Sequence, residues 1–298
     1  MKQKIMSFLF YSLAHFISAL PHWAFLGFLK TLAGLFALLD RRRKRDARVN
    51  LDFVYGETLS NAEKERIIAR CYQNFAFNIL ESLRIAVDSK EAILRRVNFV
   101  GQESAENAIP KGKPFVIITA HYGCWELAAV SAGIMYGRVG NVGRMFKNAT
   151  LDMFLRSVRE RFGIVLIDKQ NGLKAMLKMM SKGTALGMIV DQNTSESEGR
   201  LVRFFGKQVR HTPAPAILAR RFETAILPVF VQCNADFSHC TAYFRTPILP
   251  MQSEDVQEDV LKMTQQIADV TQEMIEQKPD EWFWFHKRFK NQYEEIYG

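Results

Sequence analysis

The chain has 298 residues, 48% of them hydrophobic, so it is long enough to bury a substantial core and extended disorder is not expected. Its net charge of +9 at pH 7 favours anionic partners, which can be nucleic acid, a phospholipid surface or an acidic protein. The four cysteines form no CxxC pair. They therefore indicate neither a disulfide-rich scaffold nor a zinc site, and we expect free thiols in a reducing compartment.

The N-terminal stretch differs from the rest of the chain. Residues 6–39 are almost continuously apolar and aromatic, and five basic residues follow at 41–45. Pro21 divides the stretch into two pieces, each shorter than the ~20 apolar residues that a spanning helix needs. We expect two helices that lie in or dip into the cytoplasmic leaflet, with the basic run on anionic headgroups. The alternative is two buried helices of a soluble fold.

Residues 1–45 are therefore predicted to be a membrane-anchoring segment, and residues 46–298 an α/β domain. In the second part, a capping signal at 60–63 precedes a helical pattern over 61–95. Short apolar runs then alternate with amphipathic stretches. The predicted strands are 115–120, 141–146, 164–167, 185–190 and 225–231, and the predicted helices are 125 onward, 151–162, 173–180, 213–222 and 253–290.

This alternation predicts a mixed, partly parallel sheet flanked by helices. In such sheets ligands collect beyond the carboxyl ends of the strands. The polar residues at those ends are His121, Arg144, Asp168 and Asp191.

His121 is the strongest catalytic candidate, because it ends a strand and Glu126 follows five residues later. On a continuous helix the two side chains would lie about 140° apart, so only a strand-turn-helix junction can bring them together. A carboxylate on one imidazole nitrogen fixes the tautomer and leaves the other nitrogen to act as general base. The alternative is a histidine at a helix start, with Glu126 favoured by the helix dipole.

Three segments resemble those of a known family. The stretch from His121 to Glu126 resembles the His-x4-acid motif of the glycerolipid acyltransferase superfamily, in the Glu form typical of the late acyltransferases of lipid A biosynthesis. Asp191 and Gln192 resemble that subfamily's strand-end Asp-Gln element, and residues 279–290 resemble its C-terminal Trp-x-Trp signature. The resemblance covers nearly the whole chain.

The resemblance implies transfer of a fatty acyl chain from an acyl carrier protein thioester to a hydroxyl of a lipid A precursor. It implies that the protein lies at the cytoplasmic face of the bacterial inner membrane. It also implies that the protein uses no metal and no cofactor and has no nucleic acid as partner. His121 and Glu126 would be catalytic. The implied substrate-binding residues are Arg144, Arg159, Arg161, Asp191 and Gln192.

Several alternatives stay open. The arginines can form a solvated cationic helix face, and Asp191 can cap a turn. Cys124 lies inside the motif and could form an acyl-enzyme. A glycerophospholipid acyltransferase would share the base and the anchor, and a non-catalytic membrane lipid-binding protein would share the fold.

Overall fold

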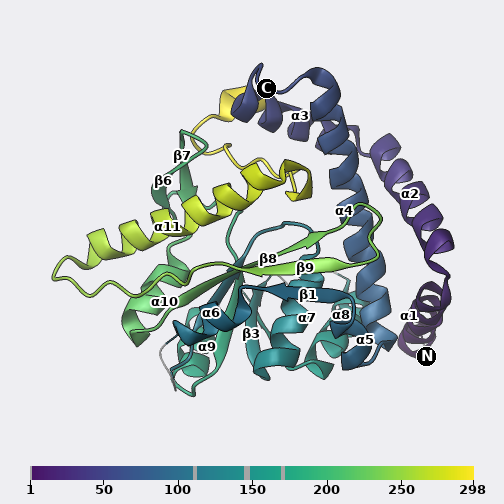
Figure 1. The fold of residues 1–298 in the computed structure, drawn as a ribbon, viewed down its shortest axis with the longest axis horizontal. Helices are drawn as coiled ribbons and strands as arrows, with labels where there is room; N and C mark the ends of the chain where they lie inside the picture. The colour runs from purple at the N-terminus through teal and green to yellow at the C-terminus, as the bar shows by residue number, and fades with distance from the viewer. Residues whose placement is uncertain (1, 110–112, 144–147, 169–171) are drawn as a thin grey trace.

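A seven-stranded sheet forms the centre of the protein (Figure 1). The structure is a computed structural model, and it describes residues 2–109, 113–143, 148–168 and 172–298. In spatial order the strands are β1 (Val97–Val100), β9 (Cys240–Phe244), β8 (Ile226–Cys233), β2 (Val116–Thr119), β5 (Ala185–Ile189), β3 (Val139–Gly143) and β4 (Ile164–Asp168). Five of the six neighbouring pairs are parallel and β8–β9 is antiparallel. The predicted mixed, partly parallel sheet is confirmed.

The sheet is buried on both faces, which explains why β2 reads as an unbroken apolar run. Ile117 belongs to one hydrophobic cluster, whereas Val116 and Ile118 belong to another on the opposite face. The first face is covered by α7 (Trp125–Tyr136) and α8 (Ala149–Arg161). The second face is covered by α9 (Gly172–Met180), α10 (Ala214–Phe222) and α11 (Val256–Gln277).

The long helix α4 (Asn61–Val87) stands beside the sheet, and α1 (Lys2–Ala19) and α2 (His22–Leu39) lie along its outer side (Figure 1). The predicted capping box is present at the start of α4, where the side chain of Glu63 accepts from the backbone N–H of Ser60 at 2.8 Å. The break between α1 and α2 falls at Pro21, as predicted.

Each of the two N-terminal helices buries only one face. Ala14, Ile17, Phe25 and Leu29 are buried in the large core cluster. The other faces are exposed and apolar; their exposed side chains include Phe8, Leu9, Phe16, Trp23, Leu38 and Leu39. The basic run begins α3 (Arg41–Tyr55), directly after α2.

Two predicted helices are shorter than the sequence pattern indicated. Residues 61–95, which were predicted to be helical throughout, form two helices. The first, α4, ends at Val87, and Ser89 caps the second, α5 (Lys90–Leu94). The pattern over 253–290 is helical only to the end of α11, since Pro279 disfavours helical backbone at the residue before it. An irregular segment with the short turns η2 (Pro279–Glu281) and η3 (Glu294–Tyr297) follows.

Other elements were not predicted. They are α3, β1, β9, α6 (Gln102–Asn107) and the hairpin of β6 (Arg200–Phe204) and β7 (Lys207–His211). The predicted strand 141–146 corresponds to β3, which begins at Val139, and residues 144–146 lie outside the described part of the chain.

Candidate active site

His121 lies just beyond the end of β2, where the backbone turns towards α7. Its carbonyl accepts a hydrogen bond from the N–H of Phe283 at 2.8 Å. The imidazole packs edge-on to the Trp125 ring at 5.3 Å and lies 6.0 Å from the Phe283 ring. About a fifth of the side chain stays exposed. The ring is therefore held by backbone and aromatic contacts while one edge remains accessible to a substrate.

Asp191, and not Glu126, is the carboxylate that holds the imidazole. Its Oδ1 lies 2.9 Å from His121 Nδ1, and its Oδ2 accepts from the His121 backbone N–H at 3.0 Å. This corrects the expected contact between His121 and Glu126, whereas the substrate-binding role of Asp191 stays a prediction. Asp191 follows β5 just as His121 follows β2, and parallel pairing of these neighbouring strands brings the two residues together.

The protonation state of this pair follows from the surroundings of the carboxylate. Burial by itself would raise the pKa of Asp191, but the charge of His121 and the hydrogen bonds from His121 and Trp282 outweigh it and hold this pKa well below its usual range. An ionised carboxylate can only accept, so Nδ1 of His121 carries the proton in that bond. Whenever the ring is neutral, Nε2 therefore carries the lone pair and can take a proton.

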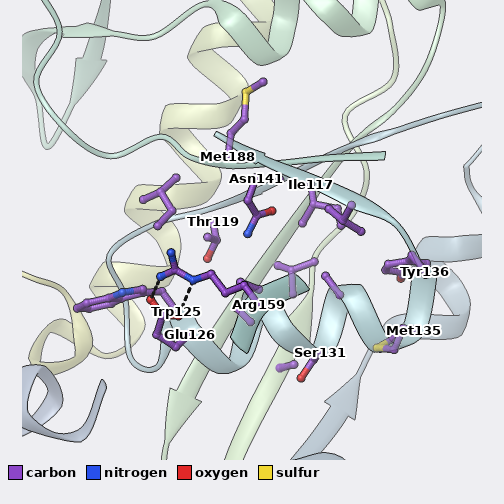
Figure 2. Close-up of a pocket in the computed structure, with 18 of the residues that line it drawn as sticks. Ile117, Thr119, Trp125, Glu126, Ser131, Met135, Tyr136, Asn141, Arg159 and Met188 are labelled. Carbon is purple, nitrogen blue, oxygen red and sulfur yellow. Dashed lines mark hydrogen bonds and ion pairs between the residues drawn. The ribbon is translucent and has the colours of Figure 1, made fainter. Parts of the chain in front are cut away.

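Glu126 lies in the first turn of α7 and pairs with an arginine from α8. Its Oε1 accepts from Arg159 Nη2 at 2.6 Å and its Oε2 from Arg159 Nε at 3.3 Å (Figure 2). Both side chains are less than a fifth exposed. The predicted catalytic residue Glu126 and the predicted binding residue Arg159 therefore form one ion pair, which lines the same cavity as His121.

The turn between His121 and Glu126 depends on Gly123. Its φ is +52°, and a Cβ at this position would collide with the carbonyl oxygen of Val231. Asn78 of α4 donates to the Gly123 carbonyl at 2.7 Å, and the Glu281 carbonyl accepts from the Gly123 N–H at 2.8 Å. The turn is thus fixed from α4 on one side and from the C-terminal segment on the other.

The C-terminal segment, residues 279–297, completes the support of His121. The indole Nε1 of Trp282 donates to Asp191 Oδ2 at 2.8 Å, and Trp282 is almost fully buried. Sequence reasoning noted this tryptophan motif but missed the contact, because residues 253–290 were expected to form one helix. The proline at 279 was the signal that the helix stops before it.

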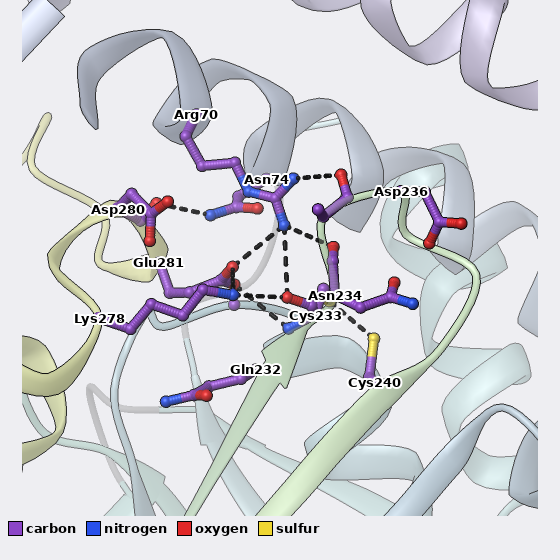
Figure 3. Close-up of polar contacts among 12 residues, drawn as sticks. Arg70, Asn74, Gln232, Cys233, Asn234, Asp236, Cys240, Lys278, Asp280 and Glu281 are labelled. Atoms are coloured by element: carbon purple, nitrogen blue, oxygen red, sulfur yellow. Dashed lines mark hydrogen bonds and ion pairs between the residues drawn. The ribbon is translucent and has the colours of Figure 1, made fainter. Parts of the chain in front are cut away.

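A buried charge cluster holds the start of this segment. Glu281 Oε1 accepts from Arg70 Nη2 at 3.1 Å and from Lys278 Nζ at 2.8 Å (Figure 3). The Glu281 side chain is fully buried, so loss of either partner leaves a poorly compensated charge. This cluster fixes the residue that directly precedes Trp282.

Arg288 fastens the loop that follows Asp191. It is fully buried and donates to the backbone carbonyls of Gln192 at 3.4 Å and Arg210 at 2.6 Å. Burial, together with the adjacent Arg288 guanidinium, lowers the pKa of His211 to about 3. The neutral His211 ring therefore accepts from Arg288 through Nδ1, at 2.9 Å.

The remaining predicted binding residues have different positions. Gln192 Nε2 lies 3.5 Å from His121 Nε2, so it is beside the site. Arg161 donates instead to the carbonyls of Ile85 and Ala86, at the C-terminal end of α4, at 2.9 and 2.7 Å. These bonds connect α8 to α4, and the substrate-binding role of Arg161 stays a prediction. Arg144 lies outside the described residues.

Two cavities meet at His121. The sheet–α7 cavity, about 240 Å³, runs from His121 and Glu126 along α7 to Met135 and Tyr136 (Figure 2). Four small residues form part of its wall and leave room there; they are Ala128, Ala129 and Ala132 on α7 and Gly187 on β5. The α9–α10 cavity, about 550 Å³, opens from His121 on the side of α9 and α10.

Within the described residues, no group of three or more His, Cys, Asp or Glu side chains is placed to hold a metal ion. All four cysteines are free and buried. Burial raises the pKa of the Cys124 thiol well above its usual range, which disfavours the thiolate that an acyl-enzyme would need.

Comparisons with known proteins identify the family of this chain. Residues 1–291 match the family model described as bacterial lipid A biosynthesis acyltransferase. A lipid A biosynthesis acyltransferase of Haemophilus influenzae is 23% identical over 82% of this chain and 74% of that protein. The lipid A biosynthesis lauroyltransferase of Escherichia coli is 22% identical over 88% of this chain and 85% of that protein.

Among solved structures, the 1-acyl-sn-glycerophosphate acyltransferase of Thermotoga maritima is similar over 88% of this chain and 99% of that chain. The sequence identity is 14% and the TM-score is 0.40. The match to the family model spans nearly the whole sequence. The chain therefore belongs to the bacterial lipid A biosynthesis acyltransferase family and is an acyltransferase.

Proposed function

We propose that this enzyme transfers an acyl chain from an acyl carrier protein thioester to a hydroxyl of a lipid A precursor, as a late acylation. The observation that carries the proposal is the position of the His121–Asp191 pair at the mouth of a narrow apolar cavity. A general base beside an apolar channel suits a reaction that deprotonates an alcohol next to a fatty acyl thioester.

His121 Nε2 takes the proton of the acceptor hydroxyl while that oxygen bonds to the thioester carbonyl carbon. Asp191 stays ionised and stabilises the imidazolium that forms. When the tetrahedral intermediate collapses, the carbon–sulfur bond breaks and His121 returns the proton to the leaving thiolate. The hydroxyl attacks directly, so the reaction needs no enzyme nucleophile, metal or redox cofactor.

The donor chain is placed in the sheet–α7 cavity, whose walls are mostly apolar. Arg159 lines the same cavity. Held by Glu126, its cation can stabilise the oxyanion of the intermediate, because a fixed charge near the developing negative charge lowers the barrier. This gives Glu126 a positioning role in place of the expected contact with His121.

The net charge of the protein supports an acyl carrier protein as donor, and the apolar N-terminal surface supports a location at the membrane. A protein of net charge +9 meets an acidic carrier protein through electrostatic steering. By length and composition, one described helix, α2, could cross a membrane. In the fold it packs on α4 and exposes an apolar face, and basic residues follow at 41–45. Residues 1–45 therefore act as the anchor on the cytoplasmic face of the bacterial inner membrane.

The general-base role is tested with His121→Gln and Asp191→Asn in the purified full chain. We expect His121→Gln to lower kcat by about 10² to 10⁴ while the melting curve is retained, since general-base catalysis is worth that much. Asp191→Asn should lose a similar factor because the tautomer is no longer fixed. The matched control is His239→Gln, at an exposed histidine. Near wild-type turnover of folded His121→Gln contradicts the mechanism.

Substrate class is tested by mass spectrometry of products from a tetra-acylated lipid A precursor and from lysophosphatidic acid. Faster turnover on the first supports the proposal, and faster turnover on the second supports a glycerophospholipid acyltransferase. No product from either acceptor, with acyl carrier protein or coenzyme A thioesters, supports a lipid-binding protein without catalysis.

A further inference from the structure

The α9–α10 cavity is larger than the sheet–α7 cavity and is not needed to hold the donor chain. Its apolar wall is formed by side chains of α9, α10 and the end of β5, and these are Leu173, Met176, Met188, Ile189, Ala214 and Ile217. Its polar lining includes Gln192, Asn193, Thr194 and Thr212. Such a combination suits an alkyl chain that carries polar groups near one end.

The two cavities approach His121 from different sides of the sheet. The sheet–α7 cavity is lined by Ile117 and Thr119 of β2, on the face covered by α7. The α9–α10 cavity is lined from α9 and α10, which cover the opposite face. The residues that line both cavities lie at or just beyond the carboxyl ends of β2, β3 and β5, and they are His121, Val142, Gly143, Met188 and Ile189. A chain in each cavity therefore brings one end to the same histidine.

The lining of the second cavity holds polar atoms that lack partners in the described part of the chain. Thr194 is 8% exposed and its Oγ1 makes no hydrogen bond, and Asn193 Oδ1 is also buried without one. Both atoms are covered by other parts of the protein, so they make this end of the cavity wall polar without offering a ligand a direct hydrogen bond.

We propose that the α9–α10 cavity binds a hydroxyacyl chain of the acceptor lipid. The inference rests on the proposed function, and it extends it by giving each substrate chain its own cavity. The acceptor chain lies between α9 and α10 with its hydroxyl at His121 Nε2. The donor chain lies under α7 with its thioester carbonyl at the same atom. The oxygen–carbon bond then forms where the cavities join, the proton passes to Nε2, and the thiolate leaves with that proton.

Two matched variants test the assignment, with one Ala→Leu change in each cavity. Ala214→Leu narrows the α9–α10 cavity and Ala132→Leu narrows the sheet–α7 cavity. We expect Ala214→Leu to raise the KM for the tetra-acylated precursor by roughly tenfold or more, with relief when the precursor's hydroxyacyl chains are shortened. Ala132→Leu should instead shift the preference towards shorter donor chains.

The reverse result, in which Ala214→Leu changes donor chain preference and leaves the acceptor KM unchanged, overturns the assignment. Failure of the proposed function is distinguishable from this. In that case the wild-type enzyme itself does not turn over the tetra-acylated precursor, whatever happens in the variants.

A binding measurement keeps the inference testable if Ala214→Leu does not fold. All four native cysteines are buried, so Ile217→Cys, at a partly exposed position in the cavity lining, introduces one reactive thiol. We expect the tetra-acylated precursor to slow maleimide labelling of this thiol several-fold, and an acyl carrier protein thioester not to slow it. Leu249→Cys, exposed and outside both cavity linings, is the control and should label at the same rate with either substrate. Protection of Ile217→Cys by the thioester alone, or by neither substrate, contradicts the inference.

Discussion

The two ends of the chain are both rich in aromatic residues, but these residues have opposite surroundings. Trp23, in the N-terminal helices α1 and α2, is 78% exposed, whereas Trp284, in the C-terminal segment, is fully buried. The C-terminal aromatics lie among paired polar groups, including the Glu281 cluster and the Trp282–Asp191 hydrogen bond. The outer faces of α1 and α2 pack against no other part of the described chain. The comparison shows that hydrogen-bonded anchors, more than hydrophobicity, distinguish the buried C-terminal segment from the exposed N-terminal helices.

The largest expected difference between the two regions is in folding stability. Trp284→Ala should lower the free energy of unfolding by about 3–5 kcal/mol, because it leaves a cavity in a packed core. Trp23→Ala should change it by less than about 0.5 kcal/mol, since an exposed side chain loses few contacts. Denaturant unfolding in detergent micelles measures both. Equal losses of unfolding free energy in the two variants would mean that α2 contributes to the core as much as the C-terminal segment does.

A smaller effect is expected from Trp282→Phe, which keeps an aromatic ring but removes the donor to Asp191. A hydrogen bond to a charged group is worth about 1.5–3 kcal/mol, so the free energy of unfolding at pH 7 should fall by that amount. Turnover should fall as well, because the carboxylate that orients His121 is less firmly held.

The pH dependence gives a sharper test of the same variant. The pKa of Asp191 is depressed in the folded state, so its stabilising contribution is present above its unfolded pKa of about 4 and is lost as the pH falls through the folded pKa. Removing a donor raises that folded pKa. The difference in unfolding free energy between the wild type and Trp282→Phe should therefore shrink when the pH falls below the pKa of Asp191 in the variant. A pH-independent difference would indicate lost packing alone.

The smallest effect is expected at the membrane-facing end. Arg42→Gln should weaken binding to anionic vesicles by about 1 kcal/mol and leave turnover on detergent-solubilised substrates unchanged. Co-sedimentation with vesicles at several salt concentrations measures the binding. The difference in binding between the wild type and Arg42→Gln should decrease as the salt concentration rises. The matched control is Arg203→Gln, at an exposed arginine on the β6–β7 hairpin. An equal loss in the control would place the membrane contact elsewhere.

The sequence was sufficient to predict the elements that follow from local patterns. The parallel strands, the Pro21 break and the capping box at Ser60 each depend on residues close together in the chain. The position of His121 at the end of β2 was predicted for the same reason.

The partners of His121 were not predicted, because they come from distant parts of the chain. Glu126 is near in sequence, but the first turn of α7 directs its carboxylate to Arg159. Asp191 contacts His121 only because β2 and β5 are neighbours in the sheet, and strand order is not encoded in periodicity. Trp282 reaches Asp191 only because the chain leaves helical geometry after Gln277.

The route of the Trp282–Asp191–His121 chain of hydrogen bonds has a consequence for biosynthesis. His121 is translated early, Asp191 follows 70 residues later, and Trp282 a further 91 residues on. Every strand of the sheet is therefore synthesised before the residue that completes the support of the histidine. Contacts of such high sequence separation form late in folding. A nascent or prematurely terminated chain can thus contain α1, α2 and every strand of the sheet while it still lacks the indole that supports Asp191 and His121.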